Sequence, residues 1–196
     1  MSPRAKSSAD NSVHKLKITL VNVEPPVWRR LLVASSTTLA VLHSVIQGSM
    51  GWMDAHLYEF QIGTTRYGLE DEDGDFDSSF ADAQETTLAA LAPAGSSFVY
   101  RYDFGDDWEH RIDVDEVEEI VALAGGVRYP CCLDGQGACP PEDVGGPPGY
   151  EHFLEAIGDP DDEEHDDYLE WVGGSFDPTH FDIDDANRRV LWTSRS

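Results

Sequence analysis

The sequence predicts an α+β domain in which a mixed β-sheet carries one helix on a face, followed by a Gly/Pro/Cys-rich loop and a helical C-terminal part. Three patterns predict this class. Apolar and polar residues alternate near the N-terminus, apolar residues recur at helical spacing over residues 38–50, and two alternating runs flank a tight turn at residues 105–107. Strands, one helix and further strands in this order indicate a sheet with the helix packed against it.

The N-terminal segment is polar and rich in Ser, and we expect residues 1–13 to be a disordered tail. Apolar residues then alternate with polar ones, which predicts a strand. The residues on its apolar face are Leu16, Ile18 and Leu20. Two prolines end this strand and residues 28–33 predict a second one, so residues 14–33 should form a hairpin or an arch.

The clearest helix is predicted over residues 38–50. The Ser/Thr run at 36–38 supplies an N-cap, and Gly51 can end the helix. Its apolar face consists of Leu39, Leu42, Val45, Ile46 and Met50. Residues 57–62 and 64–69 then show strand patterns on either side of a glycine.

An acidic loop is predicted over residues 70–82. It resembles a calcium-binding loop, but Gly74 lies two places too early for an EF-hand, so we interpret the segment as a solvated loop. Two strands follow at 97–104 and 108–117. The turn at residues 105–107 joins them and is a good hairpin signal.

The segment 123–149 is rich in Gly and Pro, and we expect it to be a loop without regular structure. Helices are expected after it, with Asp182 or Asp184 as the N-cap of the last one. Their predicted ranges are 150–157, 163–172 and 184–192. The predicted organisation is a single domain over residues 14–192, with a sheet part at 14–122, the loop at 123–149 and a helical part at 150–192.

The chain is strongly acidic, with 38 Asp and Glu against 13 Lys and Arg and a formal net charge of −25. Residues 1–68 have a net charge of +3, from seven basic and four acidic side chains. Residues 69–196 have −28, from six basic and 34 acidic side chains. Such a surface repels phosphate backbones, so nonspecific nucleic-acid binding is disfavoured and only the N-terminal third could offer a basic face.

Three features predict a cytoplasmic protein without membrane contact. The polar N-terminus lacks the apolar run of a signal peptide. No segment approaches the roughly 18–20 apolar residues that span a bilayer. The three cysteines, Cys131, Cys132 and Cys139, are an odd number clustered within nine residues, which is a poor disulfide framework, so we expect reduced thiols.

The cysteine-containing loop is the first candidate site. Ordering so many Gly and Pro residues requires side chains or a ligand, and we expect the loop to pack against the hairpin at 97–117. Cys132 and Cys139 could bind zinc with His110 as a further ligand, although their spacing is not that of a CxxC knuckle. The alternative is two buried thiols that pack under the loop.

The acidic turn of the hairpin is the second candidate site. Carboxylates crowded beside a histidine suit divalent-metal binding or general acid–base catalysis, although Asp106 and Asp107 also suit a tight turn. Turn and loop together predict one polar pocket. Its candidate residues are Asp103, Asp106, Trp108, His110, Glu142, Asp143 and Tyr150. We expect His43 and His56 to be structural.

Several motifs together resemble the plasmid pRiA4b ORF-3-like family over roughly residues 14–190. They include Pro26-Val27-Trp28-Arg29-Arg30, Met50-Gly51-Trp52, Tyr102-Asp103-Phe104-Gly105-Asp106, Cys139-Pro140-Pro141-Glu142-Asp143 and Phe176-Asp177-Pro178. The resemblance implies one α+β domain and no particular activity, although some members are labelled transposon resolvase-like. Many members have a further Cys where this chain has Val144, and this difference weakens a metal site built only from loop cysteines.

We interpret the chain as a noncatalytic accessory or interaction domain associated with plasmids and mobile elements, with zinc as the metal that could stabilise it. Its expected partner is a protein or a small ligand. One alternative is a DNA recombination accessory protein, which the acidic charge opposes. The other is a metal-dependent hydrolase or nuclease that uses Asp103, Asp106, Glu109, His110 and Glu142.

Because the net charge is −25, we expect no appreciable binding of the full chain to a random-sequence DNA duplex at about 0.15 M salt. Titration of a fluorescent duplex, followed by polarisation, checks this expectation. Micromolar binding that weakens as salt rises would contradict it and favour the recombination-accessory alternative.

Overall fold

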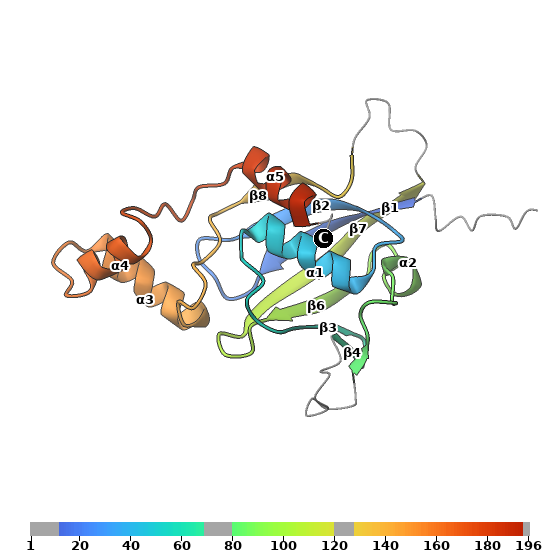
Figure 1. The fold of residues 1–196 in the computed structure, drawn as a ribbon, viewed down its shortest axis with the longest axis horizontal. Coiled ribbons are helices and arrows are strands. Elements are labelled where there is room, and N and C mark those ends of the chain that lie inside the picture. Colours follow the sequence, from blue (N-terminus) through green and yellow to red (C-terminus); the bar gives the residue numbers. More distant parts are fainter. Residues whose placement is uncertain (1–11, 69–79, 120–127, 194–196) are drawn as a thin grey trace, which may run out of the picture.

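The computed structural model describes residues 12–68, 80–119 and 128–193, and within them eight strands form one sheet. The strands are β1 Ser12–Leu20, β2 Trp28–Ala34, β3 Tyr58–Ile62, β4 Thr65–Gly68, β5 Phe80–Asp82, β6 Ser97–Tyr102, β7 Trp108–Glu119 and β8 Cys131–Gln136. The helices are α1 Leu39–Met50, α2 Leu88–Leu91, α3 Gly146–Gly158, α4 His165–Trp171 and α5 Ile183–Thr193. The predicted α+β class is confirmed (Figure 1).

The sheet order is β5-β4-β3-β6-β7-β1-β2-β8, and neighbouring strands are antiparallel except β4 and β5, which are parallel. The sheet is therefore mixed, as predicted. Both predicted hairpins are present, since β1 pairs with β2 and β6 pairs with β7. The two hairpins adjoin because β1 also pairs with β7.

Helix α1 covers one face of this sheet, and α5 lies beside it (Figure 1). The side chain of Thr38 caps α1 by accepting a hydrogen bond from the backbone of Val41, and Gly51 ends the helix at a φ of 99°. The alternation of β1 points Leu16 and Ile18 into the core, where both are fully buried. Helix α5 is also fixed to β8, because the side chain of Asn187 bonds the backbone N–H and C=O of Cys132.

Two predicted boundaries are wrong. Within the predicted loop 123–149, Cys131–Gln136 forms β8 at the sheet edge, paired with β2, and α3 already begins at Gly146. The Gly/Pro content hid a strand that forms because a distant strand, β2, pairs with it. Strand β1 begins at Ser12, so residues 12–13 belong to the sheet. The rest of the predicted tail, and residues 69–79 of the predicted acidic loop, lie outside the described residues.

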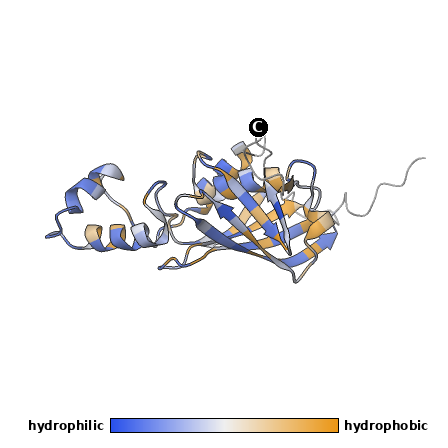
Figure 2. Ribbon diagram, turned by 90° about the horizontal axis from the view of Figure 1, so that it is seen from below, coloured by the Kyte–Doolittle hydropathy of each residue, from blue (hydrophilic) through white to orange (hydrophobic). Residues whose placement is uncertain are grey.

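Helices α3 and α4 pack together into an arm that stands away from one end of the sheet (Figure 2). Stacked and edge-on aromatic rings hold the arm together. These rings belong to Tyr150, Phe153, Tyr168, Trp171 and Phe176. Among the described residues, no helix combines the length and the apolar character needed to cross a bilayer.

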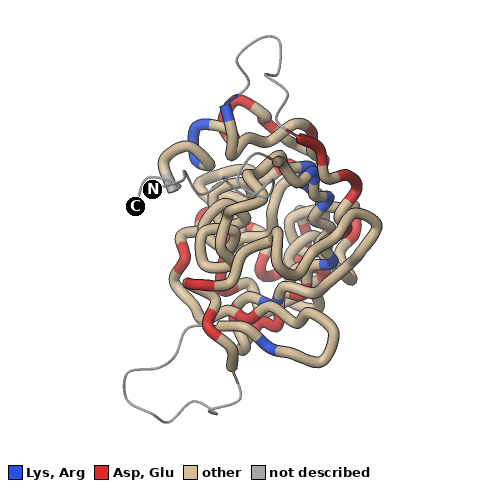
Figure 3. Tube along the Cα trace, turned by 90° about the vertical axis from the view of Figure 1, so that its right-hand side faces the viewer, with Lys and Arg blue, Asp and Glu red and all other residues tan. Residues whose placement is uncertain are grey.

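The outward-facing positions on the opposite face of the sheet include charged residues of both signs. Figure 3 marks the charged positions along the chain. Lys15 lies 3.5 Å from Glu116, and Arg30 lies 3.2 Å from Asp115. Lys15 and Arg30 therefore meet acidic residues of β7. This pairing reduces the positive field that a phosphate backbone would need on this face.

Arg29 is a charged residue buried within the core. It lies on the inward side of β2, and only 3% of its surface is exposed. Its guanidinium donates to the carbonyls of Trp28, Ser49, Gln136 and Gly137 at 2.8–2.9 Å. It also stacks 4.4 Å above the ring of Phe181. This one side chain therefore joins β2, the end of α1, the end of β8 and the segment before α5.

Replacement of Arg29 by Met should lower the free energy of unfolding by at least about 3 kcal/mol, because several buried carbonyls lose their donor. Arg30→Met is the matched control. Arg30 is the next residue on the same strand but pairs at the surface, so we expect a loss below about 1 kcal/mol. Urea unfolding measures both. Equal losses for the two variants would contradict the role given to Arg29.

Candidate functional site

Three loops meet at the end of the sheet nearest the arm: residues 52–57 after α1, 103–107 between β6 and β7, and 137–145 between β8 and α3. The first loop is held to the core by buried polar side chains of α1. Gln47 accepts a hydrogen bond from the backbone of Asp54, and Nε2 of His43 lies 2.6 Å from the carboxylate of the same residue. His43 therefore has the structural role expected from the sequence.

The third loop is held against the other two. Trp52 donates its indole N–H to the carbonyl of Pro140, and Glu142 accepts from the backbone of Met53 and from the hydroxyl of Tyr102. The backbone of Gly145 donates to Asp106 in the hairpin turn. The expected packing of this loop against the hairpin is observed.

The contact between the start of α3 and the hairpin turn is close because residue 146 is a glycine. Gly146 has a φ of 69°, and a side chain there would collide with the backbone carbonyl of Asp106. Glycine tolerates both the conformation and the approach. The start of α3 is therefore pressed against the hairpin turn.

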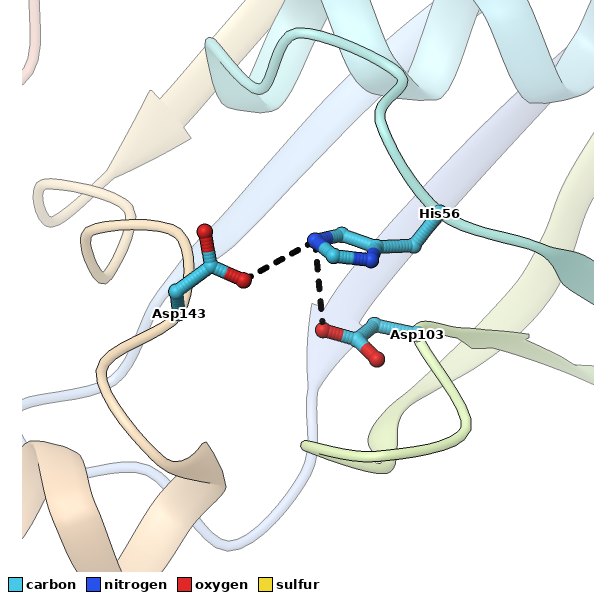
Figure 4. Close-up of side chains that lie close together, drawn as sticks. All are labelled: His56, Asp103 and Asp143. Carbon is cyan, nitrogen blue, oxygen red and sulfur yellow. Dashed lines mark ion pairs between the residues drawn. The ribbon is translucent and has the colours of Figure 1, made fainter.

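The three loops bring His56, Asp103 and Asp143 together (Figure 4). Nε2 of His56 lies 3.0 Å from Oδ1 of Asp143 and 3.6 Å from Oδ2 of Asp103. Oδ1 of Asp103 accepts hydrogen bonds from the backbone of Gly105 and Asp106, which leaves Oδ2 facing the imidazole. We call these three residues the His–Asp–Asp cluster.

The predicted pocket residues separate into three groups. Asp103, Asp106, Glu142 and Asp143 lie on the loops around the His–Asp–Asp cluster. Trp108 and His110 are buried beneath them, where both contact the ring of Trp52. Tyr150 is buried at the root of the arm. The predicted pocket is therefore a layered arrangement in which only the first group surrounds the cluster.

His110 cannot reach a substrate. It is fully buried, and its Nδ1 lies 3.1 Å from the carbonyl of Trp108. Burial lowers its pKa to about 3, so the ring is neutral near pH 7. Glu109 points to the opposite face of the sheet and pairs with Arg101. The residues of the hydrolase alternative therefore do not converge on one reacting position.

The predicted zinc ligands do not form a cluster either. Among the described residues, one group of three or more His, Cys, Asp or Glu brings its ligand atoms within 4.8 Å of one another, and it is the His–Asp–Asp cluster. Cys132 and Cys139, with His110, do not form such a group. Burial raises the pKa of Cys139 to about 12, which disfavours the thiolate that zinc requires. The buried-thiol alternative matches Cys132, which is 4% exposed.

Sequence reasoning therefore missed His56 as a site residue. The signal was weak, because a single histidine after a helix has no local pattern that indicates a ligand. Asp103 and Asp143 were both predicted for the pocket. Only the fold shows that the loop after α1 supplies His56 to the cluster.

A cavity of about 700 Å³ lies beside the cluster, between the end of α1, the 137–145 loop and the segment that runs from the arm into α5, and we call it the arm cavity. Residues 48–53 and 138–143 form one wall, and side chains between Trp171 and Arg189 form the other. Asp143 lines this cavity and also belongs to the His–Asp–Asp cluster. The volume of the arm cavity falls within the roughly 300–1,000 Å³ that is usual for ligand sites.

The family model described as plasmid pRiA4b ORF-3-like protein matches residues 12–185, which include all eight strands and the three site loops. The chain belongs to the plasmid pRiA4b ORF-3-like family. The resemblance seen in the sequence motifs is thereby confirmed.

Two proteins illustrate the similarity of this pRiA4b ORF-3-like chain to others. It is 43% identical over 184 residues to the uncharacterized protein y4hQ of Sinorhizobium fredii, covering 91% of each chain. It also resembles the crystal structure of MM3350 from Methanosarcina mazei, a protein of unknown function, with 32% identity and a TM-score of 0.77. That match covers 89% of this chain and 97% of the other. The fold of this chain is therefore shared with the solved structure of MM3350.

The buried His110 should make the fold sensitive to acid. Its folded pKa of about 3 lies below the unfolded value near 6.5, so its stabilisation is complete above pH 6.5 and is lost as the pH falls toward 3. When the pH is lowered from 7 to 4.5, we expect the titration of His110 to lower the free energy of unfolding by about 2–3 kcal/mol. Urea unfolding of the parent and of His110→Asn at both pH values measures the difference.

The control for this prediction is His152→Asn, because His152 lies in the arm and its side chain is 51% exposed. That variant should keep the acid-induced loss of the parent. Identical pH dependence in the parent and in His110→Asn would contradict the prediction.

Proposed function

We propose that this chain is a noncatalytic interaction domain that binds a basic segment of a partner protein in the arm cavity. The observation that carries the proposal is the charge of the lining. Four carboxylates and two arginines are among the described side chains that line the cavity. The carboxylates are those of Glu142, Asp143, Asp182 and Asp185, and the arginines are Arg29 and Arg189.

The two arginines already have partners. Arg29 donates to backbone carbonyls, and Arg189 lies 2.7 Å from Asp185. Glu142, in contrast, accepts hydrogen bonds from the uncharged donors Tyr102 and Met53. Negative charge in the cavity therefore exceeds the positive charge available to balance it, which favours a cationic ligand.

The apolar part of the lining suits long basic side chains. Met53 is 82% exposed and Trp171 is 48% exposed, and both line the cavity. An indole face attracts a Lys or Arg head group, and a flexible Met adapts to the aliphatic part of such a side chain. The volume suits a few side chains, so the expected ligand is a short basic segment.

Binding of a fluorescent Lys/Arg-rich peptide of about twelve residues tests this proposal. At about 0.15 M salt we expect micromolar affinity for the basic peptide, and no binding of an acidic peptide of equal length. Trp171→Ala and Glu142→Gln should each weaken binding at least fivefold, because each removes a contact in the cavity. Fluorescence polarisation measures all four titrations.

The matched control is Trp192→Ala, because Trp192 is 78% exposed on α5 and is not part of the cavity lining. This variant should bind like the parent. Equal affinity in Trp171→Ala and the parent would contradict the proposal, since it would show that the acidic surface as a whole attracts the peptide.

A further inference from the structure

The spacing of the His–Asp–Asp cluster matches that of ligands around one metal ion. Two ligand atoms bonded to the same ion at about 2.1 Å, at an angle of about 90–110°, lie roughly 3.0–3.4 Å apart. Nε2 of His56 lies 3.0 Å and 3.6 Å from the oxygens of Asp143 and Asp103. All three ligand atoms lie within 4.8 Å of one another. An ion can therefore reach all three with only small side-chain shifts.

The histidine nitrogen has an unmet bonding requirement. Nε2 of His56 is enclosed by protein, yet neither neighbouring carboxylate oxygen has the alignment of a hydrogen bond with it. A buried polar atom without a hydrogen bond is unusual and calls for a bound partner. An ion placed between the nitrogen and the two oxygens would supply that partner and would separate the two negative charges.

The surrounding hydrogen bonds fix the ligands before any ion arrives. Two backbone amides hold Oδ1 of Asp103 and leave Oδ2 available. Asp143 follows Glu142, which is itself held by Tyr102 and the backbone of Met53. Such supporting contacts orient metal ligands and are a regular part of metal sites.

We propose that His56, Asp103 and Asp143 bind one divalent transition-metal ion of the zinc or manganese class, with water completing its coordination. One imidazole and two carboxylates suit these ions, whereas calcium and magnesium prefer oxygen ligands alone. The ion joins the loops that follow α1, β6 and β8. The site shares Asp143 with the arm cavity, but zinc binding and peptide binding are measured independently and either can fail without the other.

Isothermal titration of the tag-free, EDTA-treated full chain with Zn²⁺ at about 0.15 M NaCl tests the proposal. We expect one tight site per chain, and a rise in the melting temperature on adding Zn²⁺ because the ion binds the folded state. Asp103→Asn and Asp143→Asn should each weaken this site at least tenfold. Both residues have positive φ, at 54° and 60°, and Asn tolerates this conformation, so the fold should persist.

The matched control is Asp54→Asn. Asp54 lies on the same loop as His56, has a φ of 59° and also contacts a histidine, but it is not in the cluster. This variant should bind Zn²⁺ like the parent, and circular dichroism checks the fold of all three variants. If only one of Asp103→Asn and Asp143→Asn folds, the Zn²⁺ affinity of that variant decides the test.

Two outcomes would overturn the proposal. One is the lack of a saturable site with one ion per chain, which would leave the cluster as an ion pair between His56 and two carboxylates. The other is unchanged affinity in the folded cluster variants, which would place the bound ions elsewhere on the acidic surface.

Discussion

The buried guanidinium of Arg29 is the constraint on which the rest of the structure depends. It is charged and sits at an inward position of β2, so its removal from water must be compensated by hydrogen bonds. Its acceptors are backbone carbonyls at the ends of α1 and β8 as well as in its own strand. The two chain segments that leave these ends are the ones that carry His56 and Asp143. A single core residue thus fixes the starting points of two of the three site loops.

Uncharged donors then bring the loops into contact. Tyr102 is buried, and burial together with its bond to Glu142 raises its pKa, so the hydroxyl stays protonated and donates to that carboxylate. Trp52 packs on Tyr102 and Trp108 and donates to the carbonyl of Pro140. This aromatic layer separates the surface carboxylates from the core. The acidic residues can therefore remain near solvent while their positions are set from below.

The distribution of acidity gives the two proposed sites different chemistry. Glu142 and Asp182, which face the arm cavity, have neutral or backbone donors, which leaves their charge available to a basic segment. The carboxylates of the His–Asp–Asp cluster share one imidazole nitrogen, which leaves their charge available to a small cation. Asp143 belongs to both surfaces. Its exposure and its place on a held loop make it the point where the two sites meet.

The sequence alone determined the elements whose information is local. Alternation predicted β1, β2, β6 and β7, and a Ser/Thr cap with apolar spacing and Gly51 predicted α1. The motifs predicted the family, and two of the three cluster residues were among the predicted pocket residues. Each of these signals lies within one short stretch of chain, where backbone geometry and side-chain period act directly.

Only the tertiary structure decided the features that depend on distant partners. Strand β8 is a Gly-containing segment that becomes a strand because β2 offers it an edge. Arg29 looks like a surface residue until α1 and β8 bring carbonyls to it. His56 has no local pattern and gains its place because three loops end together. Cys132 and Cys139 lie in one loop of the sequence, but they do not form a ligand cluster with His110. Proximity of side chains from separate elements is set by packing, and no local sequence period encodes it.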